Sequence, residues 1–142
     1  RGNMMAAAAM GETAFQKGLG AIHALSHPVG ALYDTHHGLT NAVFMPYVLA
    51  FNRAAIEERI QRLAAYLGLP AKFEAFQEYV LTLRATIGIP HTLKDLKVPG
   101  DKAELIAEMA IVDPTAGGNP VPLELKGARR LFAMAMAGDL KP

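Results

Sequence analysis

The stretch that decides the fold is residues 18–52, GLGAIHALSHPVGALYDTHHGLTNAVFMPYVLAFN, which holds four of the five histidines of the chain. His23 and His27 stand four positions apart in a run with helical character, so both side chains project from one face of a helix. Pro28 and Gly30 follow directly, and the sequence predicts that they break this helix.

A second pair of histidines, His36 and His37, stands directly before the glycine at which the next helix is predicted to begin. A helix, a loop and a returning helix can bring His37 back beside His23 or His27. Neutral imidazoles that converge in this way are common ligands of zinc and ferrous iron. The sequence therefore predicts a candidate metal site at this turn.

Familiar metal-binding motifs are absent from the sequence. It contains no HExxH, no Glu-x-x-His pair of the kind found in di-iron bundles, and no cysteine. A catalytic metal usually has at least three protein ligands, and a carboxylate is common among them. Asp34 is the nearest carboxylate, but its place between the helices favours a turn residue that bonds to its own backbone. Two or three imidazoles from one loop thus make an incomplete site.

The whole chain is predicted to be all-α, with six or seven helices. Residues 3–25 are rich in Ala and Met, and these small side chains predict one central helix that is packed closely on several sides. Phe15, Leu19 and Ile22 are predicted to lie in the core. No stretch alternates with the period of a strand, and no internal repeat is visible.

The later helices are predicted from apolar spacing and from residues that begin or end helices. Residues 38–51 predict an apolar helix that Pro46 kinks or restarts, and Asn52 is predicted to cap the helix that follows. Asp101 and Glu104 have the spacing of a capping box. The remaining helices are predicted over residues 56–67, 73–87 and 101–112, and from Pro122, which suits a first helical position.

The composition limits the functions that the chain can serve. Its 142 residues suit one compact domain, and 51% hydrophobic against 19% charged residues is rich for a free-standing one. We therefore expect apolar surface that a partner chain or a missing domain covers. A net charge of +1 gives no strong field for nucleic acid or an anionic membrane, and no apolar run approaches the roughly 20 residues of a membrane span. The lack of cysteine fits a reducing compartment, so we expect a cytoplasmic protein in which Arg1 is a cut edge.

The histidine-rich segment closely resembles the signature of the iron-containing (group III) alcohol dehydrogenases. That signature reads G-x-x-H-x-x-x-H-P-x-G, then H-G near a helix start, then N-A and L/M-P. The resemblance continues through GIPHTLKDL at residues 88–96 and AIVDPTAGGNPVPL at residues 110–123. It thus covers most of the chain. A match at this many positions in the same order is specific to the family.

The resemblance implies roles for individual histidines. In the family the metal is held by an Asp and a His on an earlier helix and by two histidines of the signature, which match His23 and His37 by position. His27 matches a family histidine that is not a ligand and lies near the nicotinamide and the substrate, where it helps to move the proton. The position of His36 varies in the family, which favours a surface imidazole, and His91 has no implied role.

The resemblance also implies a function for the longer protein. It implies a metal-dependent alcohol dehydrogenase that converts an alcohol to an aldehyde or ketone with NAD or NADP, uses Fe²⁺ or Zn²⁺, and forms a homo-oligomer. Residues 1–142 match the helical C-terminal domain, and the N-terminal dinucleotide-binding domain is missing from them. We expect this chain to be inactive alone and to have no nucleic-acid or membrane partner.

Two alternatives remain open at this point. One is a zinc-dependent enzyme of the same superfamily, either glycerol dehydrogenase-like or related to dehydroquinate synthase. The other is a non-catalytic helical module that self-associates and whose histidines are incidental. The HPxG and HHG arrangement followed by NAVxMP favours the alcohol dehydrogenase branch.

Overall fold

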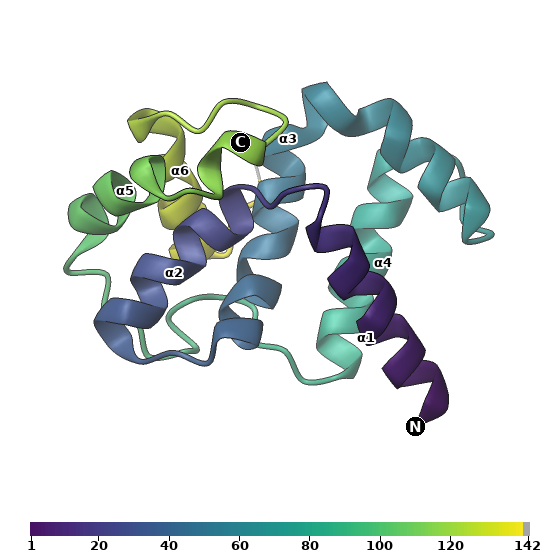
Figure 1. Cartoon of the computed structure of the whole chain (residues 1–142), viewed down its shortest axis with the longest axis horizontal. Coiled ribbons are helices and arrows are strands. Elements are labelled where there is room, and N and C mark those ends of the chain that lie inside the picture. Colours follow the sequence, from purple (N-terminus) through teal and green to yellow (C-terminus); the bar gives the residue numbers. More distant parts are fainter. Residues whose placement is uncertain (141–142) are drawn as a thin grey trace.

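A computed structural model describes residues 1–140 of the chain, and this part is all helical (Figure 1). No residue of this range lies in a β-strand, so the all-α prediction is confirmed. In chain order the elements are α1 (Gly2–Phe15), α2 (Ala21–Tyr33), α3 (His37–Tyr66), α4 (Phe73–Thr86), α5 (Ala103–Val112), the 3-10 helix η1 (Ala116–Gly118) and α6 (Leu125–Ala137).

The main core lies where α2 packs against α3 and α5, and where α6 packs against α5 and α3 (Figure 1). Its largest fully buried side chains include Leu25, Phe44, Tyr47, Ile106 and Leu131. A second, smaller cluster joins the far end of α3 to α4 through Ile60, Ala64, Phe73, Phe76 and Val80. The main core fixes α2 and the first half of α3, which carry His23, His27 and His37.

The predicted central helix over residues 3–25 is wrong. The chain breaks between α1 and α2, where Gly18 adopts a φ of +97° that other residues rarely take. Helix α1 buries no residue, and its methionines at positions 4, 5 and 10 are about three-quarters exposed. Phe15 is 51% exposed as well, so it is not a core residue. The small side chains indicated close packing, but α1 has no packed face against another described helix. Its last residue, Phe15, meets the ring of His23 edge-on, with the centroids 5.4 Å apart.

Pro28 does not end α2, contrary to the prediction. The helix continues to Tyr33 and stops where Asp34 takes the left-handed conformation, with a φ of 52°. A proline inside a helix costs about 3 kcal/mol because it removes a hydrogen bond and crowds the preceding turn. Six residues of α2 are buried, including Pro28 and Val29, and their packing offsets this cost.

Pro46 was predicted to kink or restart the helix, and α3 is continuous through Pro46 and Asn52, so the restart does not occur and Asn52 does not cap a new helix. The missing N–H of Pro46 leaves the carbonyl of Ala42 without its helical partner. Arg84 of α4 donates to this carbonyl through Nη1. In Figure 1 the second half of α3 runs in a different direction from the first and meets α4 there.

Two further local predictions are wrong, although the helices themselves are confirmed. Lys102 precedes α5 without a side-chain cap, because Asp101 accepts a hydrogen bond from Tyr33 Oη and Glu104 pairs with Arg129. Helix α6 begins at Leu125, three positions after the predicted proline. Within residues 1–140 no helix combines the length and apolar character needed to cross a bilayer.

Candidate functional site

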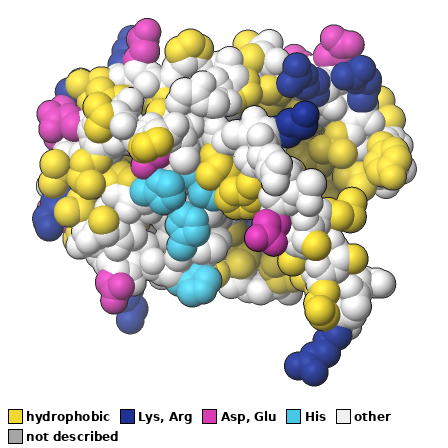
Figure 2. Space-filling view, viewed as in Figure 1, with side chains coloured by type: hydrophobic (Ala, Val, Ile, Leu, Met, Phe, Trp, Pro, Cys, Tyr) yellow, Lys and Arg dark blue, Asp and Glu magenta, His cyan; other side chains and the backbone are white. Residues whose placement is uncertain are grey.

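Three histidines converge at the turn between α2 and α3. His23 and His27 lie one turn apart on α2, and His37 is the first residue of α3. The ring centroids are 5.2 Å apart for His23 and His37, 5.4 Å for His27 and His37, and 5.8 Å for His23 and His27. Figure 2 shows histidine side chains gathered on one face of the molecule, beside a hydrophobic area. The turn thus brings His37 beside both histidines of α2.

Asn41 lies between His23 and His37. Its Nδ2 atom is 3.2 Å from Nε2 of His23 and 3.0 Å from Nε2 of His37. The two Nε2 atoms therefore point toward one place, which the amide group occupies. The Oδ1 atom of Asn41 is buried and has no hydrogen-bond partner. Sequence reasoning placed this asparagine in the N-A motif without predicting that it links the two imidazoles.

The Nε2 atoms of His23 and His37 share one partner, and two ligands of one cation must converge in this way. The separation of ring centroids does not single out this pair, since it is 5.2 Å here and 5.4 Å for His27 and His37. No group of three or more His, Asp or Glu side chains in residues 1–140 is arranged to hold a metal ion. The described chain therefore supplies two suitable imidazoles and not a complete ligand set.

The electrostatic environment favours a neutral His23. Burial lowers the pKa of His23, and the neighbouring His37 and His27 lower it further, while Asp113 acts in the opposite direction. Neutral imidazole is the form that binds metal ions. The pKa shift therefore acts in the direction that a ligand needs.

His27 has a different partner. Its Nδ1 atom lies 2.8 Å from Oδ2 of Asp113, the residue that follows α5. The other oxygen of Asp113 accepts hydrogen bonds from the backbone N–H and the hydroxyl of Thr115, at 2.8 and 2.6 Å. Burial raises the pKa of Asp113, but the bonds from Thr115 and His27 outweigh this effect, so the net pKa is lowered. Sequence reasoning missed Asp113, although it lies in the DPT segment of a loop that the resemblance covers.

The other candidates lie outside this cluster of three histidines. His36 is exposed and caps α3, since its Nδ1 accepts a hydrogen bond from the backbone N–H of Leu39. Asp34 is the left-handed residue that ends α2, in agreement with its prediction as a turn residue. His91, which had no predicted role, accepts a hydrogen bond at Nδ1 from Nη2 of Arg84.

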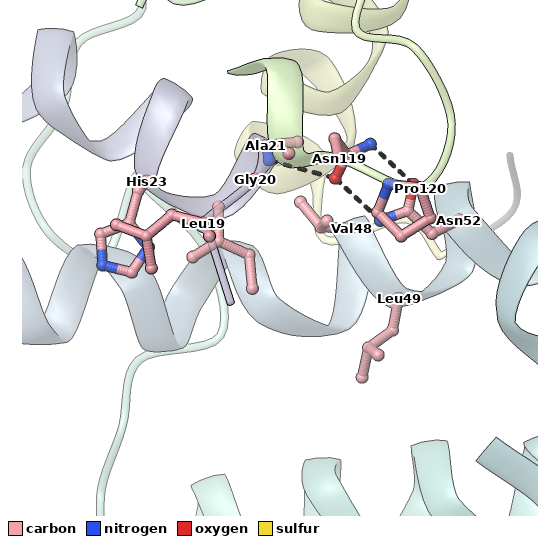
Figure 3. A pocket seen from close by; sticks show the side chains of 12 residues that line it. Leu19, Gly20, Ala21, His23, Val48, Leu49, Asn52, Asn119 and Pro120 are labelled. Carbon is pink, nitrogen blue, oxygen red and sulfur yellow. Dashed lines mark hydrogen bonds between the residues drawn. The ribbon is translucent and has the colours of Figure 1, made fainter. Parts of the chain in front are cut away.

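A cavity of about 350 Å³ adjoins the histidine cluster (Figure 3). His23 lies at one end, and Leu19, Val48 and Leu49 give the cavity an apolar lining. Asn119 and Asn52 lie at the other end and form two reciprocal amide hydrogen bonds, drawn as dashed lines. A small, mostly apolar space next to an imidazole suits a small organic molecule with one polar group.

The fold and the site together define an all-helical domain with a two-histidine candidate metal site. A family model described as "Fe-containing alcohol dehydrogenase family, C-terminal" matches residues 1–136. The chain belongs to this family and corresponds to its C-terminal part, as the sequence predicted.

Individual relatives agree with this assignment. The chain is 37% identical over 143 residues to 4-hydroxybutyrate dehydrogenase of Cupriavidus necator, covering 94% of this chain and 37% of that protein. It is 31% identical over 125 residues to lactaldehyde reductase of Escherichia coli (strain K12), covering 83% of this chain and 33% of that protein. The crystal structure of a 1,3-propanediol oxidoreductase matches with a TM-score of 0.77 and 34% identity, over 83% of this chain and 33% of that chain. The relatives are alcohol and aldehyde oxidoreductases, and this chain spans about a third of their length.

Proposed function

We propose that this chain is the helical metal-binding domain of a longer NAD(P)-dependent alcohol dehydrogenase, which interconverts a small alcohol and its aldehyde or ketone. His23 and His37 are the proposed ligands of a divalent cation, iron or zinc, and His27 is the proposed catalytic residue. The observation that carries the proposal is the convergence of Nε2 of His23 and Nε2 of His37 on the Asn41 amide.

The incomplete ligand set supports a site shared with another part of the longer protein. A catalytic metal usually needs at least three protein ligands, and the described residues supply two imidazoles. The relatives are about three times as long as the matched region, which leaves room for a dinucleotide-binding domain and further ligands. The exposed methionines of α1, at positions 4, 5 and 10, fit a surface that such a domain covers.

The residues of this chain would have separate roles in the reaction. A bound cation acts as a Lewis acid that withdraws electron density from the substrate oxygen. His23 and His37 hold that cation as neutral imidazoles. His27 accepts the proton that the alcohol releases and passes it toward solvent, since its side chain is 42% exposed. The mostly apolar cavity beside His23 would receive the carbon chain of a small substrate.

Metal analysis tests the proposal. The protein is expressed from its longer reading frame and as the 142-residue chain, purified without oxygen, and analysed for elements. We expect about one iron or zinc per long chain and little metal in the short one. His23→Ala and His37→Ala should each remove the metal from the long form. His36→Asn is the matched control, because it keeps a capping acceptor on α3 and should retain the metal.

The result separates this proposal from its alternatives. Iron with turnover of simple alcohols supports the alcohol dehydrogenase, whereas zinc with turnover of glycerol supports the glycerol dehydrogenase-like enzyme. A long form without metal, or variants of His23 and His37 that keep it, would contradict the proposed ligands. In that case the helical self-association module would be the better account of the chain.

A further inference from the structure

The two oxygens of the Asp113 carboxylate have different partners. Oδ1 accepts both hydrogen bonds from Thr115, and Oδ2 faces Nδ1 of His27. The contact joins two segments 86 residues apart in the sequence, α2 and the residue after α5. The Asp113 side chain is 12% exposed, so water competes little for its oxygens.

These partners determine where the proton of a neutral His27 lies. An ionised carboxylate can only accept hydrogen bonds, so the Nδ1 atom that faces Oδ2 must carry hydrogen. A neutral imidazole has one N–H, and its other nitrogen is then an acceptor. We propose that Asp113 is a positioning residue that holds His27 in the Nδ1–H tautomer and leaves Nε2 free to take a proton.

The consequence for the reaction rests on the proposed function. If His27 takes the proton released by the alcohol, the atom that receives it is Nε2, since Nδ1 is already protonated and bonded to Asp113. Asp113 also fixes the orientation of the ring, which stacks on His37 with an interplanar angle of 14°.

Asp113→Asn gives a sharp test because the Thr115 bonds determine how the new amide must lie. The backbone N–H of Thr115 is always a donor, so the amide oxygen has to take the place of Oδ1. The amide nitrogen then takes the place of Oδ2 and donates to Nδ1 of His27. A nitrogen that accepts this bond carries no hydrogen, so a neutral His27 in the variant must be protonated on Nε2. The substitution should reverse the tautomer.

The first experiment uses the 142-residue chain labelled with ¹⁵N-histidine. Two-bond ¹⁵N–¹H correlations, recorded near pH 9 where ordinary histidines are neutral, identify which ring nitrogen carries the proton. We expect His27 to be the Nδ1–H tautomer in the unsubstituted chain and the Nε2–H tautomer in Asp113→Asn. Asp95→Asn is the matched control, since Asp95 also accepts from a threonine N–H and hydroxyl but does not contact His27. It should leave the His27 signals unchanged.

An Nε2–H tautomer in the unsubstituted chain would overturn the proposal without any variant, so a poorly folded Asp113→Asn protein does not prevent the test. An unchanged tautomer in a folded Asp113→Asn chain would overturn it as well. Because neither readout needs metal or turnover, failure of the proposed dehydrogenase function would be visible separately.

The second experiment uses the longer protein with its metal. Asp113→Asn should lower kcat about 100-fold, within the range for loss of general base catalysis, while metal content and KM stay near those of the unsubstituted enzyme. Asp113→Glu, which restores an acceptor-only group, should recover part of the rate. A reversed tautomer with an unchanged kcat would show that Asp113 does not position His27 for the reaction.

Discussion

Arg84 of α4 replaces the hydrogen bond that Pro46 removes from α3. Its Nη1 atom donates to the carbonyls of Ala42 and Val43, at 3.2 and 3.0 Å, in the turn that precedes the proline. Arg84 is 5% exposed, and within residues 1–140 its side chain donates hydrogen bonds to backbone carbonyls and to His91 rather than to a carboxylate. The guanidinium thus supports the part of α3 that carries the candidate site.

Arg84→Met should destabilise the chain by about 2–3 kcal/mol, because buried acceptors lose hydrogen bonds from a charged group. The cost should be smaller in a Pro46→Ala background, where residue 46 regains the N–H that pairs with Ala42. Urea unfolding of the two single variants and the double variant measures this coupling.

Arg62→Met, at an exposed position on α3, is the control for loss of one arginine and should change the free energy of unfolding by less than about 0.5 kcal/mol. Equal costs for Arg84→Met with and without Pro46 would contradict the proposed link.

Asn119→Ala should destabilise the chain by about 2–3 kcal/mol. Asn119 accepts from the backbone N–H of Ala21 at the start of α2, and it exchanges two amide hydrogen bonds with Asn52. The substitution removes a helix cap and leaves the amide of Asn52, which is 5% exposed, without this partner. Thermal unfolding followed by circular dichroism measures the loss.

Asn52→Ala and Asn119→Ala should be non-additive, because each variant already breaks the same pair of bonds. Additive losses in the double variant would mean that the reciprocal bonds contribute little to stability.

Local patterns predicted the helices and the convergence of the histidines, because both depend on residues close in sequence. The i, i+4 spacing of His23 and His27 and the short turn to His37 are contained within one segment. The positions at which helices end were less predictable. Pro46 indicated a kink or a restart, but the arginine that compensates for its missing N–H lies about 40 residues later in the chain.

The partners of the candidate site were also hidden from sequence reasoning. The contact between Asp113 and His27 spans 86 residues, and that between Asn119 and Ala21 spans 98. Such pairs are determined by how α2, α5 and η1 pack, which no local spacing encodes. Helix α1 shows the opposite error. Its apolar composition predicted that it would be buried, but none of its residues is buried.

Asp95 should make the stability of the chain depend on pH in the acid range. The backbone N–H and hydroxyl of Thr92 bond to its carboxylate and lower its pKa from the ordinary value of 3.8. A carboxylate whose pKa is depressed by folding stabilises the folded state above its unfolded pKa, and this contribution is lost as the pH falls through the folded pKa.

Asp95→Asn should therefore lower Tm at neutral pH, and the difference from the unsubstituted chain should shrink as the pH falls through the lowered pKa of Asp95. Scanning calorimetry between pH 2.5 and 7 measures both curves. A difference in Tm that stays constant across this range would show that the charge of Asp95 is not the cause.

Gly118 allows η1 to approach the connection between α1 and α2 closely, and its replacement should be costly. A Cβ atom at this position would lie 1.9 Å from the backbone carbonyl oxygen of Leu19, a residue that lines the cavity beside His23. Because the obstructing atom belongs to the backbone, the two segments must move apart. We expect Gly118→Ala to destabilise the chain by about 3 kcal/mol, at the upper end for overpacking.

The neighbouring Gly117 is a matched control, since a Cβ there meets no atom within 4 Å. Urea unfolding should show little change for Gly117→Ala, and equal effects of the two substitutions would contradict the close approach of Gly118 to Leu19.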